Sequence, residues 1–191
     1  MTSRLRRLAK RAAALAAVLC TLAPPALAEA PLVLSPAAER VERGLICNPP
    51  PAGRRAAPDT IAGWVHVPDE PVRLIHHGTT APAQLGMGFG VEFTLAGDGA
   101  LAVRYTVTHP PMAPDAMTEQ AWDAFALAGQ REAIFFQFDT EDELLPGRWT
   151  FTATADGETA FSAGFDVVVP ETVPHLTALC RGTGLLSLVR P

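Results

Sequence analysis

The amino-acid sequence predicts an all-β protein, built as an antiparallel sandwich or barrel, and two observations support this fold class. Short apolar or alternating segments recur along the chain, and clusters of Gly, Pro and Asp separate them at short intervals. Many short strands with such spacing are typical of antiparallel all-β domains. The chain has no evident internal repeat, coiled-coil pattern or low-complexity tract, so its 191 residues predict one folded domain, which we place at residues 41–180.

Residues 1–28 have the pattern of a secretory signal peptide. Basic residues between Arg4 and Arg11 precede the apolar run Ala12–Leu22, and Ala26-Leu27-Ala28 forms an A-x-A cleavage site before Glu29. The apolar run is well short of the roughly 20 residues that a membrane-spanning helix needs. We therefore expect cleavage after Ala28, a periplasmic or secreted location, and no membrane insertion of the mature chain.

The mature chain keeps two cysteines, Cys47 and Cys180, in a compartment where disulfides form and persist. We expect one bridge between them, which would tie the start of the domain to its end. Two free thiols, one of them catalytic, are the alternative, but neither cysteine has the local setting of a known nucleophile motif. A third cysteine, Cys20, raises the alternative of lipidation, which the large Leu19 before it disfavours.

Loss of residues 1–28 leaves an acidic chain. Its 20 Asp and Glu residues outnumber the 15 Lys and Arg residues, of which five lie in the predicted signal peptide. The mature chain therefore has a formal net charge of about −10 and scattered arginines, which argues against nucleic acid as a partner. No lysine follows Lys10, so Schiff-base and Walker-lysine chemistry are excluded, and we expect no cofactor.

The expected elements follow in chain order. Residues 29–40 are predicted to be a loose lead-in, and residues 48–58, which contain four prolines, a polyproline-like connection. Strands are expected at Thr60–Val67, Val72–His77, Gln84–Leu95, Leu101–Thr108, Ala133–Phe138, Arg148–Ala155 and Thr159–Val169. The pair Asp156-Gly157 predicts a tight hairpin, because both residues tolerate a positive φ. Residues 181–191 are expected to form a C-terminal tail.

Residues 115–129 fit two structures. Asp115 as an N-cap, Gly129 as a stop, and Trp122 and Phe125 three residues apart favour a short helix. The same residues also fit a strand with Trp122 and Ala126 on one face, and periodicity alone does not decide between the two.

Several segments resemble an uncharacterised family of secreted bacterial proteins, the domain of unknown function number 3859. The resemblance covers roughly residues 41–170 and rests on Val41–Cys47, Pro58–Thr60, Gly86–Val91, Phe136–Asp139, Glu143–Phe151 and Phe165–Val168. It implies an immunoglobulin-like β-sandwich with a strand around Trp122. It implies no established activity and offers no catalytic residue to carry over.

Histidine and methionine side chains are the best metal candidates, because imidazole and thioether ligands suit copper in an oxidising compartment. The residues of these types that we considered are His66, His76, His77, His109, Met87, Met112 and Met117. Adjacent histidines on a strand point to opposite faces, so His76 and His77 would not bind one ion together. A copper-type site would use His66, His76 or His77, His109 and Met112. Scattered residues of these types are more often packing or surface residues, and our leading prediction is no metal.

Three further patterns favour structural roles. The G-x-G-x-G run Gly86–Gly90 continues as a strand, whereas a nucleotide-binding fingerprint needs a helix after it. The acidic residues of 139–143 lack the spacing of a calcium loop and are expected to form a solvated turn. A sugar-stacking platform of Trp64, Trp122 and Trp149 is less expected than burial between two sheets.

The sequence therefore predicts a non-enzymatic interaction or accessory module with an unknown protein or envelope partner. Its few serines lie outside any G-x-S-x-G motif, so no catalytic residue is expected. The alternative function is copper-type metal binding, and a hydrolase with an unfamiliar site has the least support.

Overall fold

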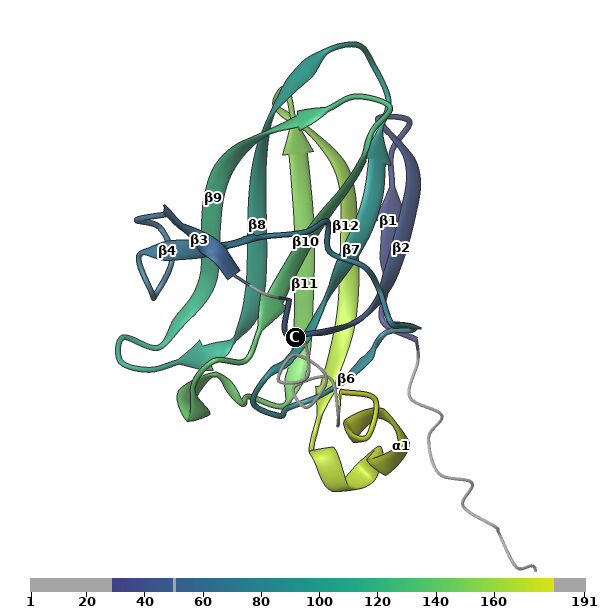
Figure 1. Ribbon diagram of the computed structural model, residues 1–191. Coiled ribbons are helices and arrows are strands. Elements are labelled where there is room, and N and C mark those ends of the chain that lie inside the picture. Colours follow the sequence, from purple (N-terminus) through teal and green to yellow (C-terminus); the bar gives the residue numbers. More distant parts are fainter. Residues whose placement is uncertain (1–28, 50, 181–191) are drawn as a thin grey trace, which may run out of the picture.

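The computed structural model describes residues 29–49 and 51–180, and almost all of its regular structure is strand (Figure 1). The strands are β1 (Leu32–Leu34), β2 (Ala38–Cys47), β3 (Pro51–Ala56), β4 (Trp64–Pro68), β5 (His76–His77), β6 (Thr80–Pro82), β7 (Met87–Leu95), β8 (Ala100–Met112), β9 (Met117–Leu127), β10 (Arg131–Gln137), β11 (Gly147–Ala155) and β12 (Glu158–Val168). Short helical turns follow at η1 (Glu141–Glu143), η2 (Pro170–Thr172) and α1 (Pro174–Thr177). The predicted all-β class is confirmed.

Two sheets stack face to face and form a sandwich (Figure 1). The larger has the order β1-β12-β11-β8-β9, with β6 added parallel to β12, and the smaller has the order β10-β7-β2-β5. The chain crosses between the sheets from β7 to β8, from β9 to β10 and from β10 to β11, and then closes with the hairpin of β11 and β12. This connectivity is that of an immunoglobulin-like sandwich, as the resemblance implied.

Two local predictions agree with the structure. Asp156 and Gly157 join β11 to β12 with φ values of 48° and 85°, the tight turn expected from their sequence. Residues 117–127 form strand β9 beside β8, with Trp122 opposite Tyr105, so the strand alternative for residues 115–129 is confirmed. Trp122 is partly buried, whereas Phe125 on the opposite face of β9 is 77% exposed.

Four segments differ from the predictions. Residues 60–63, expected to begin a strand, form a turn closed by the hydrogen bond from the Gly63 N–H to the Thr60 carbonyl at 3.0 Å, and β4 begins at Trp64. Residues 29–40 include β1 and the start of β2, because β1 pairs with the edge of β12 and the Arg43 guanidinium donates to the Ala30 carbonyl at 2.6 Å. Residues 51–56 form β3, paired with β4, rather than a polyproline-like connection. A proline is tolerated there because β3 has a partner on one side only. Within 72–77 only His76–His77 pairs as a strand, since the Leu74 N–H donates instead to the Glu92 carboxylate at 2.8 Å.

The Cys47–Cys180 disulfide, predicted from the sequence, links the end of β2 to the turn that follows α1. The predicted signal peptide, residues 1–28, and the predicted tail, residues 181–191, lie outside the described residues. None of the helices in the described part of the chain is long and apolar enough to cross a membrane.

Strand β7 lies so close to β2 and β10 that some of its positions have room only for glycine. Gly90 lies between Gly44 of β2 and Phe135 of β10. A methyl group on Gly90 would overlap the Ile134 carbonyl oxygen and the Phe135 backbone, and one on Gly44 would overlap the His76 carbonyl oxygen. The glycine run therefore lets neighbouring strands pack closely around β7, the structural role expected from the sequence.

We predict that Gly90→Ala lowers the free energy of unfolding by about 1–3 kcal/mol, the usual cost of overpacking a filled interior. Denaturant unfolding measures this change. Gly53→Ala is the matched control, because a methyl group on that glycine of β3 meets no atom within 4 Å. Equal stabilities of the two variants would contradict the packing role of Gly90.

Candidate functional site

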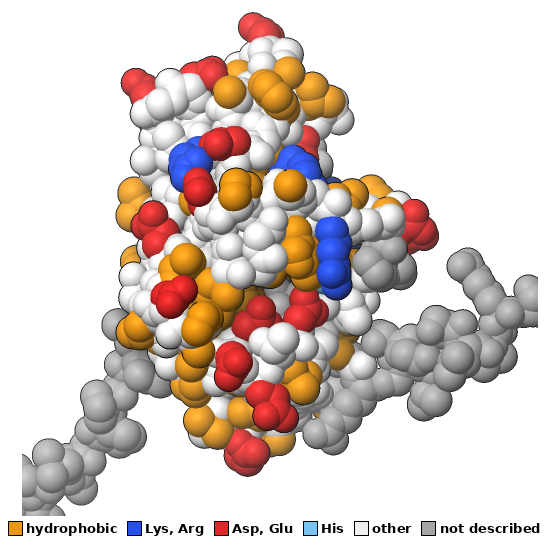
Figure 2. All heavy atoms as spheres, turned by 90° about the vertical axis from the view of Figure 1, so that its left-hand side faces the viewer, with side chains coloured by type: hydrophobic (Ala, Val, Ile, Leu, Met, Phe, Trp, Pro, Cys, Tyr) orange, Lys and Arg blue, Asp and Glu red, His pale blue; other side chains and the backbone are white. Residues whose placement is uncertain are grey.

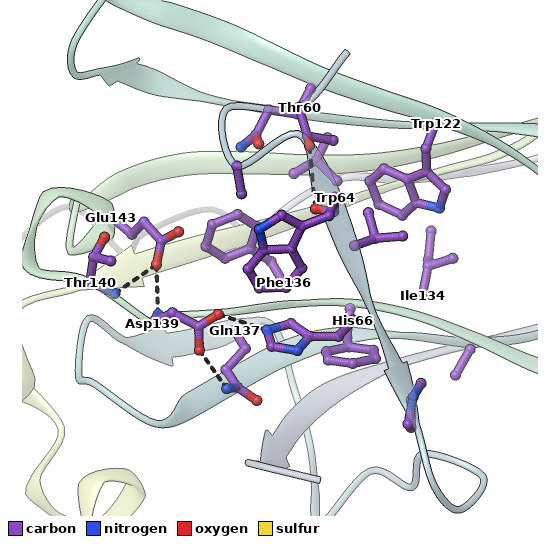
Figure 3. Close-up of a pocket in the computed structure, with 17 residues that line it drawn as sticks. Thr60, Trp64, His66, Trp122, Ile134, Phe136, Gln137, Asp139, Thr140 and Glu143 are labelled. Carbon is purple, nitrogen blue, oxygen red and sulfur yellow. Dashed lines mark hydrogen bonds and ion pairs between the residues drawn. The ribbon is translucent and has the colours of Figure 1, made fainter. Parts of the chain in front are cut away.

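A cavity of about 230 Å³ opens at the side of the sandwich where β9 and β10 are the outer strands of their sheets. The β3–β4 hairpin lies over this side, and Figure 3 shows the side chains that β4, β9 and β10 direct into the cavity. Pockets for drug-sized ligands measure roughly 300–1,000 Å³, so this one suits a small molecule or a single side chain of a partner.

Aromatic side chains form much of the cavity wall. Trp64 of β4, Trp122 of β9, and Phe135 and Phe136 of β10 all line it. The His66 ring lies edge-on to Trp64, with ring centroids 4.9 Å apart, and is stacked on Phe135 at 6.4 Å. These contacts give the cavity a wide apolar surface with one imidazole on it.

A polar group lies at one end of the cavity (Figure 3). His66 Nε2 lies 2.6 Å from Asp139 Oδ2, and Gln137 Nε2 donates to Asp139 Oδ1 at 2.7 Å. Glu143 Oε2 accepts the backbone N–H groups of Asp139, at 2.6 Å, and of Thr140, at 2.9 Å. Residues 139–143, the turn that ends in η1, thus fix two carboxylates and an imidazole beside the aromatic wall.

Burial raises the pKa of Glu143, because removal of water disfavours its charged form. The hydrogen bonds from the Thr140 and Asp139 N–H groups act in the opposite direction. The hydrogen bonds to Glu143 therefore offset only part of the free energy that burial of its charged form costs.

A chain of hydrogen bonds attaches the hairpin to the sandwich. The Gln120 side-chain oxygen accepts the Ile61 N–H at 3.0 Å, and its nitrogen donates to His109 Nε2 at 3.1 Å. His109 Nδ1 in turn donates to the Pro110 carbonyl at 2.8 Å. The neutral form of His109 fits this chain, because its Nε2 must accept a hydrogen bond.

Acidic side chains gather in the lower part of the face that carries the hairpin (Figure 2). η1, below the hairpin in Figure 1, contributes the exposed Glu141 and Asp142. The cavity lining contains neither lysine nor arginine within the described residues. The guanidinium carbon of Arg54 in β3 lies 3.7 Å from the centre of the Trp64 ring, but Arg54 does not line the cavity.

The structure does not bring the four candidate metal ligands together. His66 bonds with Asp139, His76 is exposed at the edge strand β5, and His109 and Met112 are buried in β8. Across the described ranges, no three His, Cys, Asp or Glu side chains are grouped so that they could hold a metal ion.

The remaining sequence candidates have mixed outcomes. Trp149 is fully buried between the sheets, as expected, but Trp64 and Trp122 line the cavity. The acidic turn of residues 139–143 supplies three cavity residues, Asp139, Thr140 and Glu143, in addition to the exposed Glu141 and Asp142. Sequence reasoning missed the cavity, because His66 and Asp139 are 73 residues apart and no local pattern connects them.

Comparisons with known proteins identify one family and one similar structure. The family model described as a domain of unknown function, DUF3859, matches residues 56–167. A similar solved structure is that of an immunoglobulin-like protein from Pseudomonas aeruginosa, with 19% sequence identity, coverage of 74% of this chain and 99% of that chain, and a TM-score of 0.43. No curated protein matches the chain.

The buried His109 predicts a pH-dependent stability. Burial lowers its pKa below the ordinary value of about 6.5, and the hydrogen bond to Pro110 opposes this only in part. The unfolded chain therefore takes up this proton at a higher pH than the folded chain does. The stabilising contribution is complete above about pH 6.5 and is lost as the pH falls through the folded-state pKa, by at most about 1.4 kcal/mol per pH unit.

Urea unfolding between pH 8 and pH 5, a window chosen around the ordinary histidine value of about 6.5, tests this prediction. His109→Gln should flatten the decline, because it removes the titrating group. His175→Gln is the control, since that side chain is exposed in α1, and it should keep the slope of the unmodified protein. Identical slopes for the two variants would show that His109 does not carry the effect.

Proposed function

The chain belongs to the DUF3859 family, whose description names no function, and from this premise we propose that the protein is an exported, non-enzymatic binding module. It holds a small apolar group of a ligand or partner in the cavity beneath the β3–β4 hairpin. The observation that carries this proposal is the cavity itself, with its aromatic wall and its polar end. Concave, mostly apolar sites with a few placed polar groups are where proteins usually bind small ligands.

The cavity wall is supported by the core, which favours a binding role. Phe136 lines the cavity and also contacts the fully buried Trp149, with ring centroids 4.8 Å apart. Trp122 likewise packs against Tyr105 of the larger sheet at 5.7 Å. Because these walls are in place before binding, little free energy is needed to order them around a ligand.

Several polar side chains of the cavity are already hydrogen-bonded within the protein, which supports binding without catalysis. The Thr60 hydroxyl donates to the Ala57 carbonyl at 2.7 Å, and both ends of the Gln120 amide are bonded within the protein. Within the described residues, neither serine nor cysteine lines the cavity beside the His66–Asp139 pair. The pair is therefore a better hydrogen-bonding group for a ligand than a base for an activated nucleophile.

Export is supported by two features that are far apart in the sequence. The leader-like pattern of residues 1–28 ends in an A-x-A site, and the Cys47–Cys180 disulfide is of a kind that persists in oxidising compartments.

We predict that the protein recovered from the envelope fraction of an expressing bacterium begins at Glu29. Its intact mass should match residues 29–191 with one disulfide, and alkylation should add label only after reduction. A chain that starts at Met1, or one that is alkylated twice without reduction, would contradict export or the bridge, respectively.

The cavity is tested by NMR titration with three small compounds that share a phenylethyl body: phenethylammonium, phenethyl alcohol and hydrocinnamate. The chain has three tryptophans, and each gives one indole N–H signal. We predict that at least one compound shifts the signals of Trp64 and Trp122. Trp149, which is 0% exposed and donates its indole N–H to the Leu145 carbonyl, is the internal control.

Trp64→Ala should weaken the binding of that compound by at least about tenfold, since it removes a large part of the aromatic wall. Phe125→Ala is the matched control, because Phe125 is an exposed aromatic residue on the outer face of β9. If none of the three compounds shifts the Trp64 and Trp122 signals, the proposed binding function is wrong.

A further inference from the structure

The charge of the cavity indicates which chemical class of ligand it binds. Glu143 Oε2 accepts two backbone N–H groups, and the Thr140 side chain gives the carboxylate a further hydrogen bond. The second oxygen, Oε1, accepts no backbone N–H group, and Glu143 has no ion pair within the described residues. Figure 3 shows this second oxygen turned toward the aromatic side chains of the cavity. A half-buried carboxylate oxygen with an open position on its cavity side is suited to accept a hydrogen bond from a ligand.

The surrounding charges favour a cation over an anion. Asp139 and Glu143 place two carboxylates at the same end of the cavity, and His66 is the only basic side chain of the lining within the described residues. His66, even when protonated, is paired with Asp139, so the charge of Glu143 has no counter-ion among residues 29–49 and 51–180. An anionic ligand would be repelled by this end of the cavity, whereas a cation would supply the missing counter-ion.

The aromatic wall is also suited to a positive charge. The faces of tryptophan and phenylalanine rings carry negative potential and attract ammonium and guanidinium groups. Trp64 already makes one such contact, because the Arg54 guanidinium lies over its ring at 3.7 Å. Arg54 does not line the cavity, so its contact with Trp64 does not fill the space beside Trp122 and Phe136.

A metal ion is a poorer occupant than an organic cation. His66, Asp139 and Glu143 do not form a group that could hold a metal ion, as no such group of three exists among the described residues. Much of the lining is carbon, which a metal ion leaves unused but an apolar ligand body covers.

We propose that the cavity binds a primary ammonium group on a small apolar body, with the ammonium beside Glu143 and Asp139 and the body against Trp64, Trp122 and Phe136. This inference rests on the proposed binding function and narrows it to one class of ligand. The ammonium N–H groups donate to the open carboxylate oxygen of Glu143, and the volume of about 230 Å³ limits the body to about one aromatic ring or a short alkyl chain.

The same three compounds test the inference, because they share the phenylethyl body and differ in the head group, which is cationic, neutral or anionic. At pH 7, phenethylammonium should bind at least about tenfold more tightly than phenethyl alcohol, as expected for a charge-assisted hydrogen bond in a partly buried site. Hydrocinnamate should bind most weakly. Dissociation constants come from the shifts of the Trp64 and Trp122 indole signals.

Glu143→Gln isolates the charge, because glutamine keeps the shape and an oxygen for the two backbone N–H groups. This variant should lose most of the preference for ammonium over alcohol and should change the alcohol affinity little. Glu141→Gln is the matched control, since Glu141 is an exposed acid of the same helical turn that does not line the cavity. It should keep the preference. Thermal unfolding verifies that both variants are folded.

The outcomes separate this inference from the function on which it rests. If alcohol and ammonium bind equally well, or if Glu143→Gln leaves the preference unchanged, the cavity binds apolar groups without regard to charge and the ammonium assignment is wrong. Tighter binding of hydrocinnamate would overturn it as well. If no compound shifts the two indole signals, the binding function itself fails.

Discussion

The packing of Phe89 between the two sheets is the interaction on which the rest of the structure depends. Phe89 belongs to β7 of the smaller sheet and is 0% exposed. Its ring meets Trp149, Phe151 and Phe165 of the larger sheet at centroid distances of 5.5, 5.6 and 5.2 Å, each with a steep interplanar angle. Edge-to-face pairs of this kind add stability beyond the area they bury. The Phe89 ring thus sets the separation of the sheets, and the glycines beside it in β7 keep the neighbouring strands of the smaller sheet close.

The core determines the shape of the cavity through residues that belong to both. Phe136 contacts Phe89 at 6.2 Å and Trp149 at 4.8 Å, and it also forms part of the cavity wall. His109 packs on Trp149 at 4.9 Å and starts the hydrogen-bond chain that reaches the hairpin through Gln120. Both the wall and the cover of the cavity are thus connected to the same tryptophan. A cavity built in this way is largely formed before any ligand arrives.

The sequence predicts the sandwich well because side-chain alternation is a local signal. In β11, inward residues such as Trp149, Phe151 and Ala153 are 0% exposed and alternate with threonines. This alternation predicts the strand from its own sequence. Strand β3 has no such signal, because residues 52–56 are exposed and a proline begins it, whereas β4 overlaps the strand expected at Thr60–Val67. The cavity is less predictable still, since it depends on which strand the hairpin covers. That contact forms between the Asp59 carbonyl and the Ala121 N–H at 3.0 Å, far apart in the sequence.

Polar contacts and two apolar residues of its turn hold the hairpin: Ala57 is 2% exposed and Ile61 packs against the core. Exposed residues dominate β3, and the bonds of Ile61 and Asp59 to β9 attach the turn that follows it. Segments with few buried apolar contacts open locally at a lower free energy than the core does. A ligand in the cavity contacts the hairpin through Trp64 and the sandwich through Phe136, so its binding energy is added to those few polar bonds. The hairpin is therefore the part of the molecule whose stability depends most on occupancy of the cavity, while the disulfide-linked sandwich remains closed around Phe89.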